Sequence, residues 1–164
     1  MTLSLPPFQN MIDVHGEDVW RVLVASVGKD DAEDCYQETF VSALRAYPKL
    51  RPDSDLRAWI LTIAHRKALD VHRGRARHAV PVAEIQEPAD SNGRPGPSPN
   101  SDRDDGLWQA VHQLPERQRS AVVLRFVGDL AHSEIATAIG CSEEAARRSL
   151  HEGLTKLRKE VLTA

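Results

Sequence analysis

No apolar run in this 164-residue chain approaches the ~20 consecutive residues that a membrane-spanning helix requires. The first residues, MTLSLPPFQNMID, have neither the basic start nor the long apolar stretch of a secretory signal. Only two cysteines are present, Cys35 and Cys141, and they lie far apart in the sequence. Because disulfides are rare in the cytosol, we expect both thiols to be reduced and structural. These absences predict a cytoplasmic protein that does not insert into a membrane.

Familiar catalytic and metal-binding motifs are missing as well. The sequence has no H-x-x-x-H, no C-x-x-C and no Gly-rich phosphate loop, and no cluster of Ser, His and acidic residues stands out. An enzyme or metal protein would have to be built on His132, Cys141 and His151, with Glu134 nearby. Scattered histidines on helix surfaces are usually only solvated. We therefore expect no enzyme activity, no catalytic residues, no metal and no cofactor.

Strand-like alternation and internal repeats are also absent, and aromatic residues make up only 5% of the chain. Residues 81–105, PVAEIQEPADSNGRPGPSPNSDRDD, include almost no large apolar side chains. Such a segment cannot bury enough surface to order itself, so we expect a flexible linker. The sequence thus predicts an all-α protein of two small helical domains, residues 1–80 and 106–164, joined by that linker. The second domain is expected to contain a helix-turn-helix.

Three helices are expected before the linker. The first covers residues 17–27, the second covers residues 30–47 with Asp30 as its cap, and the third begins after a cap at Ser54 or Asp53. Apolar spacing of i, i+3 and i+4 predicts which positions face inward. They are Val19, Trp20, Leu23, Val24 and Val27 in the first helix, Ala32, Cys35, Tyr36, Phe40, Ala43, Leu44 and Tyr47 in the second, and Leu56, Trp59, Ile60 and Ile63 in the third.

Charge is unevenly distributed along the chain, whose net charge is −3. Residues 1–60 and 81–107 are net acidic, whereas residues 61–80 carry five Lys or Arg against the single acid Asp70. A basic stripe in an acidic protein predicts one face for phosphates and another for a basic protein partner. The alternative is that these cations only solvate the end of a helix.

The stretch from Ala131 to Leu157 is typical of a short helix, a tight turn and a longer helix. Gly140 suits the left-handed position that ends the first helix, and Ser142 suits the cap of the second. This geometry presents the second helix to a DNA major groove, and the alternative is an ordinary helical hairpin in an all-α core. The expected inner positions are Val122, Val123 and Phe126 in the preceding helix, and Ala146, Leu150, Leu154 and Leu157 in the second helix of the motif.

Two sets of motifs stand in order along the chain. The first is DAEDCYQETFVSALRAY followed by LRAWILTIAHRKALDVHRGRAR, and the second is LPERQRSAVVLRFVGDLAHSEIATAIGCSEEAARRSLHEGLTKLR. Together they resemble regions two and four of the extracytoplasmic-function (ECF) sigma factors, bacterial members of the sigma-70 family. The resemblance implies a factor that binds core RNA polymerase and directs promoter-specific transcription initiation. The alternative is a two-domain helix-turn-helix DNA-binding regulator that does not join polymerase, and co-purification with core polymerase discriminates between the two.

The resemblance implies that the DAED…QE helix docks on the clamp helices of the polymerase β′ subunit. An acidic face also suits a basic partner on charge grounds, although without the family a solvated outer face would be the preferred interpretation. The implied partners are the core polymerase, through its β′ and β subunits, and promoter DNA, and the resemblance also allows an anti-sigma factor. The implied core-polymerase-binding residues are Asp31, Glu33, Asp34, Gln37 and Glu38.

The resemblance also implies that the third helix and the loop before it engage the −10 promoter element as a single strand. Single-stranded DNA needs a basic groove with pockets or stacking surfaces for unstacked bases. Trp59 shares a face with apolar residues, so a core position is favoured over a stacking platform. The implied −10 residues are Arg51, Ser54, Arg57, His65 and Arg66, with Arg73, Arg75 and Arg77 on phosphates.

The second motif set is expected to recognise the −35 element as a duplex. Arginine side chains can pair with guanine edges or with phosphates, and glutamates can accept from cytosine amino groups. The segment from residue 131 onward is charge-balanced, so it should neutralise few phosphates. The implied −35 residues are Arg119, Ser133, Ser142, Glu143, Glu144, Arg147, Arg148 and His151.

Overall fold

The computed structural model of the chain describes residues 4–78 and 101–163, and within these ranges every regular element is a helix. The all-α class predicted from the sequence is therefore confirmed. The elements are α1 (Phe8–Val27), α2 (Lys29–Ala46), the 3-10 turn η1 (Tyr47–Lys49), α3 (Leu56–His78), α4 (Ser101–Gln113), α5 (Glu116–Phe126), α6 (His132–Ile139) and α7 (Glu143–Thr163).

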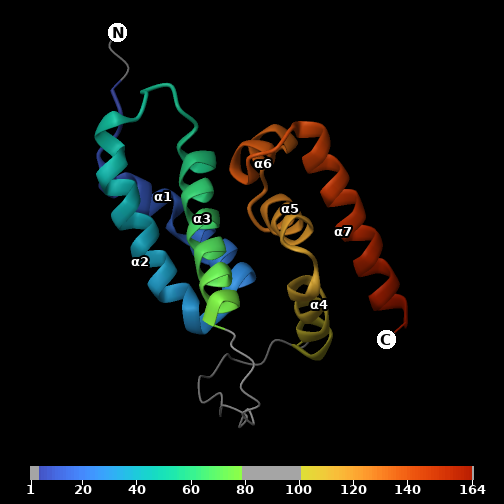
Figure 1. Ribbon diagram of the computed structural model, residues 1–164. Coiled ribbons are helices and arrows are strands. Elements are labelled where there is room, and N and C mark those ends of the chain that lie inside the picture. Colours follow the sequence, from blue (N-terminus) through green and yellow to red (C-terminus); the bar gives the residue numbers. More distant parts are fainter. Residues whose placement is uncertain (1–3, 79–100, 164) are drawn as a thin grey trace.

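Helices α1, α2 and α3 pack pairwise around one apolar core (Figure 1). Val19 and Leu23 of α1 and Ile60 and Leu61 of α3 are fully buried there. Burying a side chain of this size stabilises the fold by about 1.5–3 kcal/mol. These contacts fix α3 along its length, and α3 carries most of the residues expected to bind the −10 element.

Helix α1 begins at Phe8, nine residues earlier than the sequence predicted. The extra turns are held by tertiary contacts, because Met11 is buried and the ring of Phe8 lies edge-on to Tyr47 at a centroid distance of 5.3 Å. Gly28 ends the helix as expected from its freedom to adopt a positive φ, here 81°. The capping role predicted for Asp30 is wrong, since α2 already begins at Lys29 and Gly28 occupies its N-cap.

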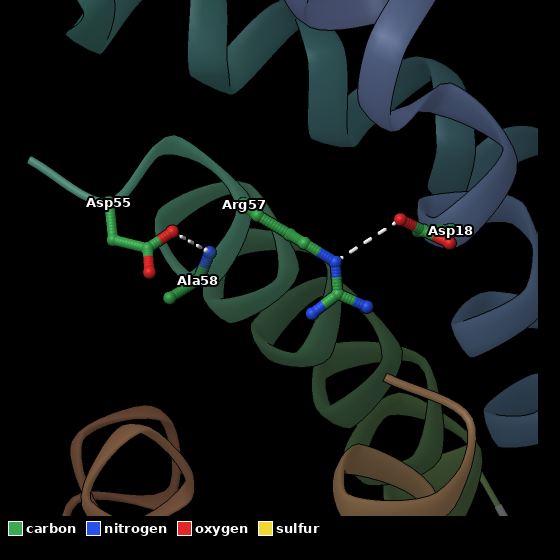
Figure 2. Close-up of polar contacts among 4 residues, drawn as sticks. All are labelled: Asp18, Asp55, Arg57 and Ala58. Carbon is green, nitrogen blue, oxygen red and sulfur yellow. Dashed lines mark hydrogen bonds and ion pairs between the residues drawn. The ribbon is translucent and has the colours of Figure 1, made fainter. Parts of the chain in front are cut away.

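Helix α3 is capped by Asp55, and not by Ser54 or Asp53 as predicted. The backbone N–H of Ala58 donates to Oδ1 of Asp55 over 3.0 Å (Figure 2). Two predicted inner residues lie at the surface: Trp20 is 39% exposed and Leu44 is 55% exposed. Trp20 instead packs edge-on against Tyr36 at the rim of the core, with ring centroids 5.9 Å apart.

Helices α4 to α7 form a second group with its own apolar centre, which includes Leu124, Leu130 and Ile135. Helix α4 begins at Ser101, so residues 101–105, which we expected within the linker, are helical. The prediction of flexibility for residues 81–100 concerns a segment that lies outside the described residues.

Phe126 was expected inside but is 63% exposed at the end of α5. The two residues predicted to be buried with it, Val122 and Val123, are indeed buried. Position 126 shares a helix face with positions 122 and 123, but at the last turn of α5 its ring lines an open groove with them and stays exposed.

The two groups of helices lie side by side, with α6 packed against α3 and α5 packed against α1 (Figure 1). An ion pair also joins them, since Nη2 of Arg73 on α3 lies 3.1 Å from Oε1 of Glu116 on α5. The second group therefore covers part of α3.

Candidate nucleic-acid interface

Helices α6 and α7 form the helix-turn-helix that the sequence predicts. Gly140 follows α6 in the left-handed conformation, with φ 79° and ψ 43°. The backbone N–H of Ala145 donates to Oγ of Ser142 over 3.1 Å, which caps α7. The N–H of Ala131 donates to the Glu134 carboxylate over 2.8 Å at the start of α6. These local bonds fix where α6 and α7 begin.

The structure places the five side chains predicted to read the −35 element on one exposed face at the start of α7: Glu143, Glu144, Arg147, Arg148 and His151. The opposite face carries Ala146 and Leu150, which are buried. Within the exposed face, Arg147 donates to Glu143 one turn earlier, over 2.6 Å. Two acids and, one turn later, two arginines thus share a solvent-facing helix start, a surface that suits base edges better than a row of phosphates.

The three other predicted −35 residues have different surroundings. Ser133 is exposed at the start of α6. Ser142 is exposed, but its hydroxyl accepts the capping hydrogen bond of α7. Arg119 is half-buried and donates to the backbone carbonyl of His112 over 3.1 Å, so it braces α5 against α4.

The predicted polymerase-binding residues share the outer face of α2. Glu33, Asp34, Gln37 and Glu38 are all exposed there, whereas Cys35 and Thr39 are buried on the opposite face. The fifth predicted residue, Asp31, is partly covered and forms an ion pair with Arg75 of α3.

Several arginines predicted to meet the −10 element are engaged by carboxylates of this chain. Nε of Arg57 lies 3.2 Å from Oδ2 of Asp18 on α1, and both side chains are 29% exposed (Figure 2). Arg51 pairs with Asp53 in the loop before α3, at 3.1 Å. The others are placed as follows: Arg73 pairs with Glu116, Arg75 pairs with Asp31, Arg66 and Arg77 are exposed, and Ser54 is half-buried.

Trp59 is half-buried and packs against the core, with its ring 6.2 Å from that of Tyr47. The same side chain also lines a cavity of about 340 Å³ between α3 and α6. On the α3 side the cavity is lined by Asp55, Ala58, Trp59, Thr62, Ile63 and Arg66, and on the α6 side by Glu134 and Thr137. Trp59 thus has a core contact and a second face on this cavity.

His65 is only 3% exposed, although the resemblance implied a DNA contact. Burial lowers the pKa of its imidazole from 6.5 to about 4, because desolvation disfavours the charged ring. The cations Arg66, Arg119 and Arg73 act in the same direction, and the carboxylate of Glu116 opposes them. The Nε2 atom is buried without a hydrogen-bond partner among the described residues.

Two further histidines lie near the contact between the helix groups. Burial and, secondarily, the charge of Arg119 lower the pKa of both His72 and His112. A ring nitrogen of His72 also lies 2.6 Å from the carbonyl oxygen of Ser26 on α1. Neutral imidazoles are therefore favoured where α5 meets α1 and α3.

An apolar groove on the second helix group was missed by sequence reasoning. It has a volume of about 610 Å³ and lies between α4, α5 and the end of α7. The sequence features that could have indicated the groove are the adjacent apolar residues Leu107 and Trp108, together with Phe126. The apolar spacing predicts a core position for Phe126 instead. The groove is lined by Leu107, Trp108, Val111, Val122, Val123, Phe126, Val127, Leu154, Leu157, Arg158, Val161 and Leu162.

Comparison with known proteins identifies the family. The family described as Sigma-70 region 2 matches residues 11–78, and the family described as Sigma-70, region 4 matches residues 105–157. RNA polymerase sigma factor CarQ of Myxococcus xanthus is 36% identical over 132 residues, which cover 78% of this chain and 73% of CarQ. The chain belongs to the ECF group of sigma-70 family sigma factors. Sigma factors direct promoter-specific transcription initiation by RNA polymerase, and they are transcription regulators rather than enzymes.

Other ECF sigma factors match over most of this chain. ShbA of Streptomyces griseus is 34% identical over 134 residues, covering 77% of this chain and 69% of ShbA. SigE of Mycolicibacterium smegmatis is 29% identical over 164 residues, covering 94% of this chain. The chain spans only 62% of the length of SigE.

Solved sigma-factor structures share the fold. RpoE of Bartonella quintana, in complex with the anti-sigma factor NepR, superposes with a TM-score of 0.75 at 19% identity, covering 94% of this chain and 96% of RpoE. CnrH in complex with the cytosolic domain of CnrY gives a TM-score of 0.69 at 21% identity, covering 93% of this chain and 85% of CnrH. In the part of the ECF sigma factor that the structure describes, no helix is long and apolar enough to cross a membrane.

Proposed function

We propose that this ECF sigma factor docks on core RNA polymerase through the exposed acidic face of α2 and contacts promoter DNA at two places. Helix α3 and the loop before it engage the −10 element, and the start of α7 reads the −35 element. The observation that carries the proposal is the joint presence, in one chain, of an acidic α2 face, an arginine-bearing α3 and a capped helix-turn-helix.

The α2 contact rests on charge and exposure. The exposed face of α2 presents carboxylates and an amide to solvent, from Glu33, Asp34, Gln37 and Glu38. The opposite face of the same helix is buried in the core. Such an acidic exposed face attracts a basic surface and sets the orientation of the encounter. We assign it to the clamp helices of the β′ subunit.

One of the two DNA contacts supplies affinity, and the other supplies sequence specificity. The arginines of α3 supply the attraction for phosphates, which carries little sequence information. The outer face of α7 offers Arg147 and Arg148 beside Glu143 and Glu144, and these side chains can distinguish base pairs in a major groove. The −35 contact therefore contributes specificity, and the −10 contact contributes most of the salt-dependent binding.

The apolar groove on the second helix group is proposed as the docking site for the β subunit. Leu107, Trp108, Phe126 and Leu162 are exposed along it, and a contiguous apolar surface of this kind marks an interaction site. The helix-turn-helix face for DNA lies at the start of α7, whereas the groove reaches the end of α7. One unit can therefore hold polymerase and DNA at the same time.

Residues 1–80 and 101–164 are proposed to act as two units at the promoter, with residues 81–100 as the linker, because α4 already begins at Ser101. The protein is proposed to work in the cytoplasm and to have no enzyme activity of its own. An anti-sigma factor is a further proposed partner, because RpoE and CnrH, which share this fold, were both solved with proteins that bind them.

Gel filtration with purified core polymerase tests the proposal against a DNA-binding regulator that acts without polymerase. We expect the chain to elute with core polymerase in the absence of DNA. A chain that binds duplex DNA but never elutes with core polymerase would favour the regulator.

A further inference from the structure

The cavity between α3 and α6 has one wall from each helix group. Its volume is about 340 Å³, at the small end of the range of ~300–1,000 Å³ that small-molecule sites occupy. On the α3 side, the lining residues recur every three or four positions from Asp55 to Arg66, so they form one stripe along the helix. Helix α6 packs against α3 and supplies the other wall (Figure 1). The cavity thus fits one small organic molecule.

Trp59 gives the cavity an aromatic wall. The indole is anchored by the core, with its ring centroid 6.2 Å from that of Tyr47. Ile63, which is half-buried one turn later on α3, extends the apolar surface. Aromatic rings pack on an indole in offset-stacked or edge-on arrangements, and an indole also attracts a cation. This wall therefore favours a ligand with an aromatic body.

Two carboxylates of the cavity are held in position by backbone groups. Oδ1 of Asp55 accepts the N–H of Ala58 over 3.0 Å (Figure 2), and Oε2 of Glu134 accepts the N–H of Ala131 over 2.8 Å. The second oxygen of each carboxylate has no hydrogen-bond partner among the described residues. Both carboxylates are thus oriented and can still accept a hydrogen bond from a ligand.

Two threonines of the cavity add further acceptors. The hydroxyl of Thr62 donates to the carbonyl oxygen of Ala58 over 2.8 Å, and the hydroxyl of Thr137 donates to that of Ser133 over 3.1 Å. Because a hydroxyl has a single proton, these oxygens are left to accept from a ligand. Acceptors on both walls favour a ligand with a cationic amine, which has several donors and no acceptor.

Arg66 brings a positive charge to the same cavity. Within residues 4–78 and 101–163, Arg66 forms no ion pair, and neither do Asp55 and Glu134. Opposite charges therefore line one cavity without pairing with each other. A guanidinium binds a carboxylate or a phosphate through two parallel hydrogen bonds. The lining thus matches a ligand that carries an anionic group as well as an amine.

We propose that this cavity binds a small aromatic zwitterion, of which an aromatic amino acid is the simplest example. The amine lies against the carboxylates of Asp55 and Glu134, the anionic group pairs with Arg66, and the ring packs on Trp59. Such a ligand contacts both helix groups of the free chain, so its binding stabilises their contact by mass action.

Nuclear magnetic resonance of the full-length chain, labelled with the heavy nitrogen isotope, tests the proposal. The indole N–H of each tryptophan gives its own signal, and Trp20 and Trp108 lie outside the cavity lining. Phenylalanine has the ring and both charges, phenethylamine lacks the carboxylate, and phenylpropionate lacks the amine. We expect phenylalanine to shift the Trp59 signal saturably, with a dissociation constant of about 1 mM, and the other two compounds to bind about tenfold more weakly.

Two variants test the charged contacts separately. Arg66→Gln should weaken phenylalanine binding about tenfold and leave phenethylamine binding unchanged, whereas Glu134→Gln should weaken the binding of both. Glutamine keeps an oxygen that can accept the N–H of Ala131, so the start of α6 is preserved. Arg117→Gln and Asp13→Asn, at exposed positions of α5 and α1, are the matched controls and should bind phenylalanine like the wild type.

Three results would overturn the proposal. The first is the absence of a saturable Trp59 shift with phenylalanine at about ten times the expected dissociation constant. The second is a shift confined to Trp108, which would place the ligand in the apolar groove. The third concerns deoxyadenosine monophosphate, which has a ring and an anion but no cationic amine. If it binds as tightly as phenylalanine or more so, the cavity is a nucleotide site and does not select a zwitterion.

Discussion

Arg73 of α3 donates a hydrogen bond to Glu116 of α5 over 3.1 Å and so joins the two halves of the chain across 43 sequence positions. Arg73 is also one of the residues expected to contact a promoter phosphate. Because one guanidinium is assigned both roles, its variants would mix the loss of a DNA contact with the loss of the ion pair between the helix groups. Tests of phosphate binding therefore use arginines farther along α3.

Charge reversal of the acidic α2 face should prevent binding to core polymerase. Asp34→Lys with Glu38→Lys changes two exposed residues one turn apart, so the helix and its buried face stay intact. We expect the variant to lose co-elution with core polymerase while its far-ultraviolet circular dichroism is unchanged.

The control for that experiment is Asp13→Lys with Glu17→Lys. These acids are also exposed and four residues apart, but on α1. The control should still co-elute. If the α2 variant co-elutes equally well, the docking surface lies elsewhere.

Neutralising Arg75 and Arg77 to alanine should weaken promoter binding by the holoenzyme on every sequence. Each phosphate contact that is lost should reduce the slope of log K against log salt by about 0.7–0.9. Titration of matched promoters at several salt concentrations measures the effect, with Arg21→Ala and Lys29→Ala as exposed cations outside α3. A salt slope equal to that of the control would exclude both arginines from the phosphate contact.

Arg147→Ala should relax sequence preference at one −35 position. The side chain is exposed at the start of α7 and is held by Glu143 in the free chain. If it reads a base, its removal should cost about 1–3 kcal/mol on the preferred promoter and less on promoters changed at that position. Arg117→Ala, an exposed cation of α5, serves as the control. If the variant loses equal binding free energy on all −35 sequences, Arg147 contacts a phosphate and does not recognise a base.

Phe126→Asp should weaken core-polymerase binding without unfolding the chain. The ring is 63% exposed in the apolar groove, so a carboxylate there stays solvated in the free protein but is costly in an apolar interface. We expect the dissociation constant for core polymerase to rise about tenfold, or ~1.4 kcal/mol. Val14→Asp is the control, because Val14 is 67% exposed on α1 and outside the groove. If both variants change the dissociation constant by a similar small amount, the groove is not part of the interface with core polymerase.

Stability should fall as the pH is lowered from about 6.5 toward 4. The folded-state pKa of His65 is lowered from 6.5 to about 4, so over this window the unfolded chain binds a proton that the folded chain does not. Above pH 6.5 the imidazole is neutral in both states, so His65 does not lower the free energy of unfolding. At pH 5 its protonation in the unfolded chain lowers the free energy of unfolding by about 2 kcal/mol. His72 and His112 shift in the same direction and add to the effect.

Urea unfolding at pH 5 and pH 8 measures this loss. The groups that act on His65 are Arg66 and Arg73 on its own helix and Glu116 and Arg119 on α5. His65→Gln should show a smaller pH dependence than the wild type, because one titrating group is gone. An unchanged pH dependence would mean that His65 is not buried as a neutral ring in solution.

The helix-turn-helix could be predicted because its signals are local. Gly140 can adopt a positive φ and Ser142 can cap a helix whatever lies around them, and both do so in the structure. The exposed face of α7 follows from the spacing of Ala146, Leu150 and Leu157. The acidic face of α2 follows in the same way from the buried positions opposite it.

Features that depend on distant residues could not be predicted. The first turns of α1 are held by the contact of Phe8 with Tyr47, which no local pattern encodes. The burial of His65 and the pairing of Arg73 depend on how two helix groups meet, and hydrophobic periodicity within each group does not fix that. Sequence reasoning therefore placed both residues on a DNA surface and missed their role within the chain.

Run-off transcription with purified core polymerase on a library of promoters is the most direct test of the central claim. We predict that core polymerase alone gives no specific transcripts, and that adding the chain yields transcripts from a subset of promoters sharing −10 and −35 sequences. Asp34→Lys with Glu38→Lys should abolish them. Transcripts that are independent of the chain, or that show no shared promoter sequence, would contradict the account.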